Sequence, residues 1–385
     1  MPQLSASIKS KLPKVGTTIF SKMSALAAQE NAINLSQGFP DFDCSPKLVE
    51  LVSKAMKSGA NQYAPMSGLI GLREQISEKT EKLYTGKYKP DTEVTITAGA
   101  TQAIFTAIAA SIEEGDEVII FTPAYDCYEP AIDLAGGICI FVELKSPEYR
   151  INWDEVKKLI NQRTKMVIIN TPHNPTGTIM TGQDMLQLEK ILDKSDILVL
   201  SDEVYEHILF DGYEHQSVAR FPKLAERSFI ISSFGKTYHT TGWKIGYCLA
   251  PEKLMTEFRK AHQYNVFSVH TPSQQAYAEF LEYEDEYLNL KHFYQKKHDL
   301  FKDAIKESRF NPYQTAGSYF QLLDYSNISD ENDIEFAERL TKEFKIASIP
   351  TSVFYNRKVD QKVLRFCFAK QDETLLRAAE ILNKI

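Results

Sequence analysis

The feature that most constrains the fold is an alternation of short apolar runs with helical patterns between residues 90 and 235. Strand-like runs occupy residues 94–97, 117–121, 136–143, 165–170, 197–202 and 229–231. Strands that alternate with helices predict βαβ units and a mostly parallel sheet. The run at 197–200 is apolar at every position, which is typical of a central strand covered on both faces. We therefore expect an α/β fold with a mostly parallel sheet between helices.

The remaining patterns predict a second, smaller unit. Apolar residues at helical spacing predict helices over 19–29, 46–58, 69–83, 100–112, 153–160, 184–194 and 255–264. After residue 272, charged helical patterns accompany strand-like runs at 318–324, 347–350 and 363–368, against which the N-terminal segment is expected to pack. We predict a large domain over residues 41–274 and a small α+β domain formed by residues 1–40 and 275–385.

The composition is that of an ordinary globular enzyme, with 43% hydrophobic and 25% charged residues among 385. A net charge of −7 argues against nucleic acid or an anionic membrane as the main partner. No apolar run is long enough to span a bilayer, and the first residues lack the apolar core of a secretory signal. Five scattered cysteines without zinc-like spacing suit a reducing compartment. The sequence thus predicts a cytoplasmic protein.

Lys236 is the first candidate for a functional side chain. The apolar run at 229–231 ends at Ser232 and Ser233, after which we expect a loop that contains Lys236. Most lysines are surface charges. In α/β sheets, however, ligands bind beyond the carboxyl ends of the strands, so a lysine at this position is well placed to meet one.

Three further polar residues occur where the pattern predicts burial or a rigid turn. Asn174 lies in a turn, 171–177, that contains two prolines and a glycine. Asp202 ends a buried strand, so its charge needs a partner. Arg365 lies between apolar neighbours and needs an anion, for which a structural salt-bridge partner is one candidate. We interpret His173, beside Asn174, as a bystander.

The junction after the strand at 94–97 is a candidate anion site. Small residues open a helix there, and a helix N-terminus presents free backbone N–H groups and the positive end of its dipole. By itself this signal is weak, because any junction of a strand with a helix favours small residues.

The segments 233–236 (Ser-Phe-Gly-Lys) and 242–246 (Gly-Trp-Lys-Ile-Gly) resemble the signature of class I/II aminotransferases, fold type I enzymes that depend on pyridoxal 5′-phosphate. The resemblance covers nearly the whole chain. It implies that Lys236 forms a Schiff base with the cofactor and that Ser233 and Lys244 bind its phosphate. The family usually has arginine at the position of Lys244, and lysine provides a point charge in place of a bidentate fork.

The same resemblance implies roles for the other candidate residues. The segment 174–177 (Asn-Pro-Thr-Gly) is similar to a motif of the family. The implied cofactor contacts are Ala100, Thr101 and Gln102 at the phosphate, Tyr125 on the ring, Asn174 and Tyr205 at the phenolic oxygen, and Asp202 at the ring nitrogen. The implied substrate contacts are Gly38, Asn174 and Arg365 at the carboxylate and Phe20 at the side chain. Ordinary core packing is the alternative for Tyr125.

Tyr63 lies in a loop, and two interpretations are open. It is either a packing residue or, as the resemblance implies, a contact to the phosphate of the cofactor in a neighbouring subunit. The second interpretation requires a homodimer.

The resemblance implies an enzyme that transfers the amino group of an amino acid to a 2-oxo acid in a ping-pong cycle, with Lys236, Asp202 and Tyr205 as catalytic residues. It is closest to the subgroup that contains methionine and kynurenine/glutamine aminotransferases. No second arginine is placed for a dicarboxylic side chain, so methionine or another large apolar or aromatic amino acid is preferred. The alternatives are a kynurenine (aromatic) aminotransferase with β-lyase activity on cysteine conjugates, and a non-catalytic regulatory protein that binds pyridoxal phosphate.

Overall fold

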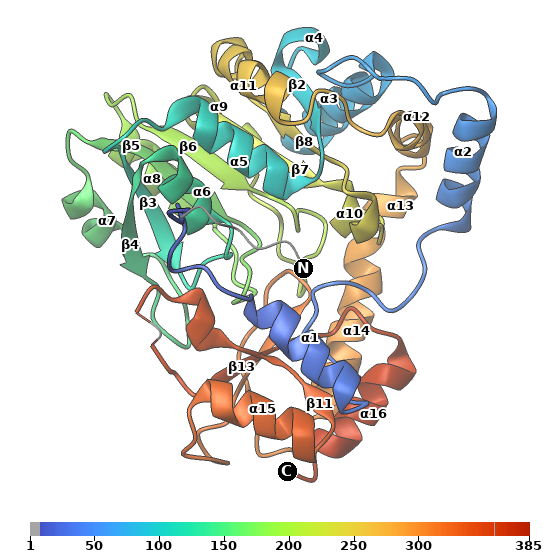
Figure 1. Cartoon of the computed structure of the whole chain (residues 1–385), viewed down its shortest axis with the longest axis vertical. Helices are drawn as coiled ribbons and strands as arrows, with labels where there is room; N and C mark the ends of the chain where they lie inside the picture. Colours follow the sequence, from blue (N-terminus) through green and yellow to red (C-terminus); the bar gives the residue numbers. More distant parts are fainter. Residues whose placement is uncertain (1–7, 358) are drawn as a thin grey trace.

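The computed structural model describes residues 8–357 and 359–385, and its largest feature is a seven-stranded sheet (Figure 1). The strands are β2 (Val94–Thr97), β3 (Glu117–Thr122), β4 (Ile138–Glu143), β5 (Thr164–Asn170), β6 (Leu198–Asp202), β7 (Ser228–Ser233) and β8 (Gly246–Leu249). Their order is β2-β8-β7-β6-β5-β3-β4. β8 is antiparallel to both of its neighbours, and the other neighbouring pairs are parallel. The predicted α/β fold with a mostly parallel sheet is confirmed.

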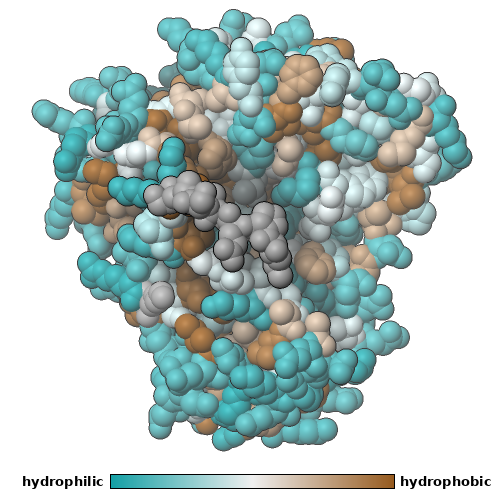
Figure 2. Space-filling model, in the orientation of Figure 1, coloured by the Kyte–Doolittle hydropathy of each residue, from teal (hydrophilic) through white to brown (hydrophobic). Residues whose placement is uncertain are grey.

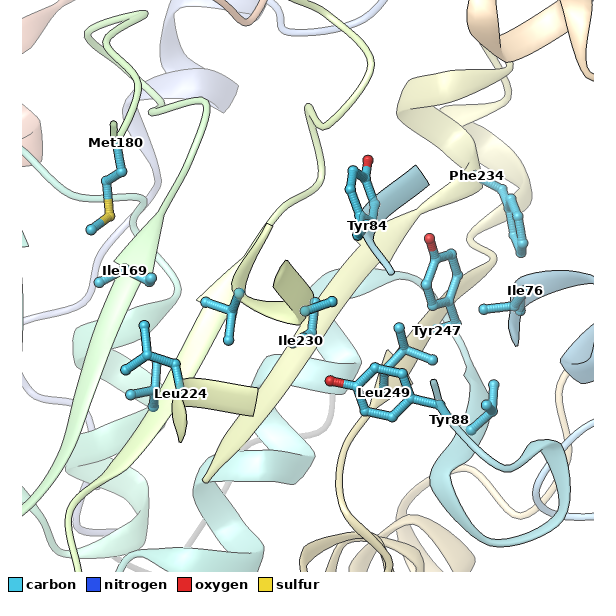
Figure 3. Packing of buried hydrophobic residues seen from close by; sticks show 14 of the residues in the cluster. Ile76, Tyr84, Tyr88, Ile169, Met180, Leu224, Ile230, Phe234, Tyr247 and Leu249 are labelled. Carbon is cyan, nitrogen blue, oxygen red and sulfur yellow. The ribbon is translucent and has the colours of Figure 1, made fainter. Parts of the chain in front are cut away.

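Helices cover both faces of this sheet, because its strands carry apolar side chains on both sides. On one face, Ile168 and Ile231 pack with residues of α5, α6 and α11. On the other face, Ile169 and Ile230 pack with residues of α2, α3, α7, α8 and α12, and Figure 3 shows part of this cluster. The covering helices are α2 (Pro46–Lys57), α3 (Ile70–Tyr84), α5 (Ala100–Ser111), α6 (Tyr128–Ala135), α7 (Trp153–Leu159), α8 (Gly182–Leu192), α11 (Glu252–Asn265) and α12 (Thr271–Phe280).

A second, antiparallel sheet has the order β12-β13-β10-β9 and its own hydrophobic cluster. Its strands are β9 (Asn311–Pro312), β10 (Phe320–Asp324), β12 (Ile349–Pro350) and β13 (Val363–Cys367). The helices around it are α1 (Ile19–Gln29), α14 (Leu290–Ala304), α15 (Asp333–Glu343) and α16 (Asp372–Leu382), and Figure 1 shows α1, α15 and α16 together in its lower part. The short strand β1 (Ile33–Asn34) pairs in parallel with β11 (Ile346–Ala347), so the N-terminal segment joins this unit as expected.

Short helices complete the described chain: α4 (Pro90–Glu93), α9 (Pro222–Ala225), α10 (Phe234–Thr237), α13 (Asp285–Leu288), and the 3₁₀ turns at Val218–Arg220, Thr241–Trp243 and Thr351–Phe354. The expectation of a loop around Lys236 is wrong, because that residue lies in the helical turn α10 directly after β7.

The predicted domain boundary at 274/275 falls inside α12, which packs on α2 and α3 against the large sheet. The small sheet has a hydrophobic cluster of its own, separate from the two clusters on the faces of the large sheet. The domain limits themselves stay a prediction, and residues 1–7 of the predicted small domain lie outside the described residues.

The surface gives a further, limited finding. On the face in Figure 2, hydrophilic residues predominate over the lower part of the molecule, where Figure 1 shows α15. Among the helices that the structure describes, none combines the length and the apolar character needed to cross a bilayer.

Candidate active site

A cavity of about 300 Å³ lies at the carboxyl ends of the central strands. β5, β6 and β7 end at Asn170, Asp202 and Ser233, and these three residues line it. β8 runs in the opposite direction, so it begins at the same edge, where Gly246 pairs with Ser233. The sheet therefore brings separate segments together at the edge where α/β proteins bind ligands.

Most of the residues predicted from the sequence line this one cavity. They come from the large sheet, from the N-terminal segment and from β13. They are Phe20, Gly38, Ala100, Thr101, Tyr125, Asn174, Asp202, Tyr205, Ser233, Lys236, Lys244 and Arg365.

Lys236 is partly buried, and its amine is bound by two oxygens. Its Nζ donates hydrogen bonds to the Gly38 carbonyl at 2.9 Å and to the Tyr319 hydroxyl at 2.7 Å. Burial lowers the pKa of Lys236 to about 8, because a low-dielectric site disfavours the charged form. About a tenth of this amine is therefore neutral at pH 7, and the neutral form is the nucleophile and the base.

Asp202 is 3% exposed and faces the same cavity. Its Oδ2 accepts a hydrogen bond from the Tyr128 hydroxyl at 2.6 Å, and its Oδ1 accepts a longer one, 3.4 Å, from the Val204 N–H. Burial raises the pKa of Asp202 to about 6, and the Tyr128 hydrogen bond opposes that rise. The carboxyl group is therefore mostly ionised at neutral pH.

Arg365, in β13, is 1% exposed and donates to neutral oxygens within the described part of the chain. Nη1 donates to the Asn174 side-chain oxygen at 2.7 Å, Nη2 donates to the Ser36 carbonyl at 3.3 Å, and Nε has no partner among the described residues. Burial lowers the pKa of Arg365 to about 10, so it stays charged at neutral pH. A buried cation with donors to spare is suited to a ligand carboxylate. Neither of these acceptors is a carboxylate, so the contacts do not include the structural salt bridge that the sequence left open.

The start of α5 forms a cradle of backbone N–H groups. Gly99 precedes it with a φ of 79°, a conformation that favours glycine. A Cβ at Gly246 would lie 2.7 Å from a backbone oxygen of β7 and 2.9 Å from the Ala100 nitrogen, so β8 and α5 approach closely. Lys244 brings its Nζ within 3.2 Å of a Cβ built at Gly99. With the Ser233 hydroxyl beside them, these groups suit a phosphate.

Aromatic side chains form other parts of the wall. The Tyr125 hydroxyl lies 3.3 Å from Thr101 Oγ1, and the Phe20 ring centroid lies 5.3 Å from the guanidinium carbon of Arg365. Burial raises the pKa of both Tyr125 and Tyr205, so the two hydroxyl groups stay protonated at neutral pH.

Two predicted residues do not line this cavity. The Gln102 side chain accepts a hydrogen bond from the Ala98 N–H at 3.1 Å and donates to Thr106 at 2.5 Å, so its amide is occupied within its own segment. Tyr63 is 80% exposed and packs edge-on against Phe267, with the ring centroids 5.1 Å apart. A cofactor contact by Gln102 would thus use its backbone N–H, and both roles stay predictions.

Two tyrosines that contact the candidate residues were not predicted from the sequence. Tyr128 binds Asp202 from 74 positions away, and Tyr319 binds Lys236 from 83 positions away. Both belong to hydrophobic clusters and give no local signal that separates them from core residues. His173 does not line the cavity, in keeping with its interpretation as a bystander. Its Nδ1 lies 2.7 Å from Thr176 Oγ1.

The family model for aminotransferase class I and II matches residues 30–382. The chain belongs to this family. Escherichia coli methionine aminotransferase is 50% identical to this aminotransferase over 378 residues, which are 98% of either chain. A crystal structure of Escherichia coli YbdL, identified as having a methionine aminotransferase function, gives a TM-score of 0.97 at 50% identity and covers 99% of this chain and 100% of that one. A kynurenine–oxoglutarate transaminase of Dictyostelium discoideum is 34% identical over 411 residues, covering 96% of this aminotransferase and 94% of the relative. The fold type I architecture expected from the sequence is confirmed.

The family implies pyridoxal phosphate as cofactor, and the residues of the cavity fit that group. A buried amine of lowered pKa suits its aldehyde, and a buried carboxylate suits its ring nitrogen. The N–H groups at the start of α5, together with a lysine and a serine, suit its phosphate.

Proposed function

We propose that this aminotransferase transfers the amino group of methionine, and of other large apolar or aromatic amino acids, to a 2-oxo acid with the aid of pyridoxal phosphate. One observation carries the proposal. Lys236 and Arg365 line the same cavity, and their hydrogen bonds in the described chain go to neutral oxygens. The amine is available to an aldehyde and the guanidinium to a carboxylate, and an amino acid substrate requires both.

We assign the phosphate of the cofactor to Ala100, Thr101, Ser233 and Lys244, with the Gln102 N–H as a further donor. Lysine supplies a charge there without the bidentate geometry of arginine. Bound pyridoxal phosphate supplies an electrophilic aldehyde and a ring that withdraws electrons from the bond that breaks.

We assign the rest of the cofactor to residues from three strand ends. Asp202 would face the ring nitrogen, because an ionised carboxylate favours the protonated form of a nitrogen beside it. Asn174 and the protonated hydroxyl of Tyr205 would donate hydrogen bonds to the phenolic oxygen. Tyr125 would pack on the face of the ring.

We assign proton transfer at the substrate α-carbon to Lys236. Its pKa of about 8 lies near neutral pH, where a general base and acid is most effective. The Gly38 carbonyl and the Tyr319 hydroxyl would bind this amine whenever it is not bonded to the cofactor. Tyr205 assists by stabilising the charge on the phenolic oxygen.

We assign the substrate carboxylate to Arg365, Asn174 and the segment at Gly38. Asn174 already accepts a hydrogen bond from Arg365 Nη1 at 2.7 Å, which fixes one side of the guanidinium and leaves Nε free. Fixing the carboxylate restricts the orientation of the α-carbon relative to Lys236, which favours the proton transfer.

The substrate preference rests on the walls near Arg365. Its guanidinium carbon lies 3.9 Å from the Phe320 ring centroid and 5.3 Å from that of Phe20, so the carboxylate site is bordered by aromatic rings. Such walls favour a thioether or aromatic side chain over a second carboxylate. The identity with Escherichia coli methionine aminotransferase supports methionine. The similarity to a kynurenine–oxoglutarate transaminase supports kynurenine as the second candidate, with β-lyase action on cysteine conjugates as a side activity.

A donor panel tests the proposal. The purified holoenzyme is mixed with methionine, kynurenine, phenylalanine and aspartate, and the loss of the absorbance of the aldehyde form is followed for each. We expect methionine to react fastest and aspartate slowest. Faster reaction with aspartate would contradict the proposal, and faster reaction with kynurenine would favour the second candidate. The control variant Lys236→Ala should show no turnover, and borohydride should not fix the cofactor to it. The alternative of a non-catalytic regulatory protein predicts no turnover in the native protein.

We also propose a homodimer in which Tyr63 of each subunit completes the neighbouring site. Tyr63 is 80% exposed and is not among the residues that line its own cavity, which supports this arrangement. Mixing inactive Lys236→Ala with inactive Tyr63→Ala chains should restore about a quarter of native activity, because random mixed dimers contain one native site. No recovery of activity after confirmed exchange of subunits would contradict the homodimer proposal.

A cytoplasmic location stays part of the proposed function. The five cysteines, which are free thiols, support it.

A further inference from the structure

Tyr128 begins α6, directly behind the carboxylate of Asp202. Its side chain is 3% exposed, and its hydroxyl donates to Asp202 Oδ2 at 2.6 Å. We propose that Tyr128 is a positioning residue, which fixes the orientation of the Asp202 carboxylate and keeps it ionised. The effect on Asp202 does not depend on any cofactor, and only its consequence for pyridoxal phosphate rests on the function proposed above.

The position of the Tyr128 ring is fixed by packing. The ring belongs to the cluster that contains Ile168 of β5 and Leu200 of β6. It also meets the Tyr125 ring edge-on, with the centroids 5.8 Å apart and an interplanar angle of 81°. The hydroxyl therefore cannot swing away from Asp202 without moving core residues.

The two oxygens of Asp202 are bound unequally. Oδ2 has the short bond from Tyr128, whereas Oδ1 has only the 3.4 Å contact from the Val204 N–H. Asp202 lines the candidate active site, and Tyr128 lines a separate cavity of about 450 Å³. Tyr128 thus approaches the carboxylate from outside the active site and leaves Oδ1 for a group within it.

The charged groups near Asp202 do not replace this hydrogen bond. Glu203 raises the pKa of Asp202 and Lys236 lowers it, while burial is the largest effect and raises it. Glu203 is itself turned to His215, whose Nε2 lies 2.8 Å from its Oε2. Asp126, Lys244 and Arg365 line the same cavity as Asp202. Thiol and phenol groups that also interact with Asp202 have pKa values raised by burial: Cys127, Tyr125 and Tyr205. The Tyr128 hydrogen bond is the strongest influence that keeps the carboxyl ionised.

Tyr128 acts as a donor over the whole working range of pH. Burial and the nearby Asp202 raise the pKa of its phenol well above the ordinary value, so the hydroxyl keeps its proton. Loss of the hydroxyl should therefore raise the pKa of Asp202 from about 6, so that about half or more of the carboxyl group is neutral at pH 7. A neutral carboxyl group cannot balance the charge of a protonated ring nitrogen.

The test compares Tyr128→Phe with Tyr88→Phe; Tyr88 is buried, and its hydroxyl has no hydrogen-bond partner within residues 8–357 and 359–385. The cofactor is removed from the full-length protein, and the Asp202 carboxyl is titrated by difference infrared spectroscopy against Asp202→Asn. Tyr128→Phe should raise the pKa of Asp202 by about 1 to 2 units, the effect of one hydrogen bond to a charged group. Tyr88→Phe should leave it unchanged. An unchanged pKa in Tyr128→Phe would overturn the proposal.

A second variant distinguishes the loss of the hydrogen bond from an effect of altered packing. Incorporation of 3-fluorotyrosine at position 128 makes the phenol a stronger donor and should lower the pKa of Asp202, the opposite of Tyr128→Phe. Shifts in the same direction for both would overturn the proposal.

In the holoenzyme, the pH at which half of the cofactor is released should be higher for Tyr128→Phe than for the native protein. The protein is removed by filtration, and the released cofactor is measured by its absorbance in the filtrate. If the native protein does not bind pyridoxal phosphate, the proposed function fails, while the infrared titration still decides the role of Tyr128. If release shifts as expected but the infrared titration does not, the role of Tyr128 fails and the proposed function stands.

Discussion

The hydroxyl of Tyr319 is expected to determine how much of Lys236 is neutral at pH 7. It accepts a hydrogen bond from Nζ at 2.7 Å, while the ring centroid lies 5.3 Å from Nζ. Tyr319→Phe removes the acceptor and keeps the ring. A hydrogen bond from a charged donor contributes about 1.5–3 kcal/mol, and about 1.4 kcal/mol equals one pKa unit. The pKa of Lys236 should therefore fall from about 8 by about 1 to 2 units.

Covalent capture of the cofactor is the assay. About a tenth of an amine with a pKa near 8 is neutral at pH 7, and the variant should be about half to nine-tenths neutral. Because only the neutral amine attacks an aldehyde, the cofactor-free variant should bond to pyridoxal phosphate about five- to ninefold faster at pH 7. Stopped-flow absorbance gives this rate, and its dependence on pH gives the pKa.

Tyr294→Phe is the matched control. Tyr294 is buried, its hydroxyl has no hydrogen-bond partner in the part of the chain that the structure describes, and its ring centroid lies 5.8 Å from that of Tyr319. It should leave the capture rate and the pKa of Lys236 unchanged. A pKa that stays near 8 or rises in Tyr319→Phe would refute the reasoning.

Three further outcomes are expected. Arg365→Lys should lower kcat/KM for amino acids about ten- to a hundredfold with cofactor content unchanged, since one charged hydrogen bond and the fork geometry are lost; steady-state kinetics and absorbance would show this. Gly246→Ala should lower the free energy of unfolding by about 1–3 kcal/mol and weaken cofactor binding, because its methyl group meets backbone atoms at 2.7 and 2.9 Å; thermal unfolding with and without cofactor tests it. Affinity for pyridoxal phosphate should fall as the pH is lowered through about 6, because Asp202 becomes protonated below that pH, and fluorescence titration at several pH values measures it.

Local patterns were sufficient for most of the secondary structure. The helix expected at 19–29 and the strand at 94–97 have those limits in the structure, because strong apolar periodicity marks both ends. The chain around Lys236 was less predictable. Phe234–Thr237 is a single helical turn, too short for a periodic pattern, and the sequence indicated only a loop.

The contacts within the site depended on tertiary structure. Sequence patterns located Lys236 and Arg365, but their partners Tyr319 and Phe320 lie at the start of β10, in an apolar run that resembles any core strand. The helix that starts at Tyr128 was not predicted either, because its eight residues are few for a helical period to appear. Which hydroxyl meets which charge follows from the packing of the sheet and not from neighbours in the chain.

The pairing of β1 with β11 has a consequence for how this enzyme can diversify. It anchors Phe20 and Gly38 to the unit that carries Arg365, whereas Lys236, Asp202 and Ser233 belong to the large sheet. The proposed donor-selecting residues Phe20, Gly38 and Arg365 therefore belong to a different unit from Lys236, Asp202 and Ser233, which are proposed to hold the cofactor. Grafting a stretch such as residues 19–38 from a relative, together with its strand partner, should exchange donor selectivity while the machinery for the vitamin stays intact.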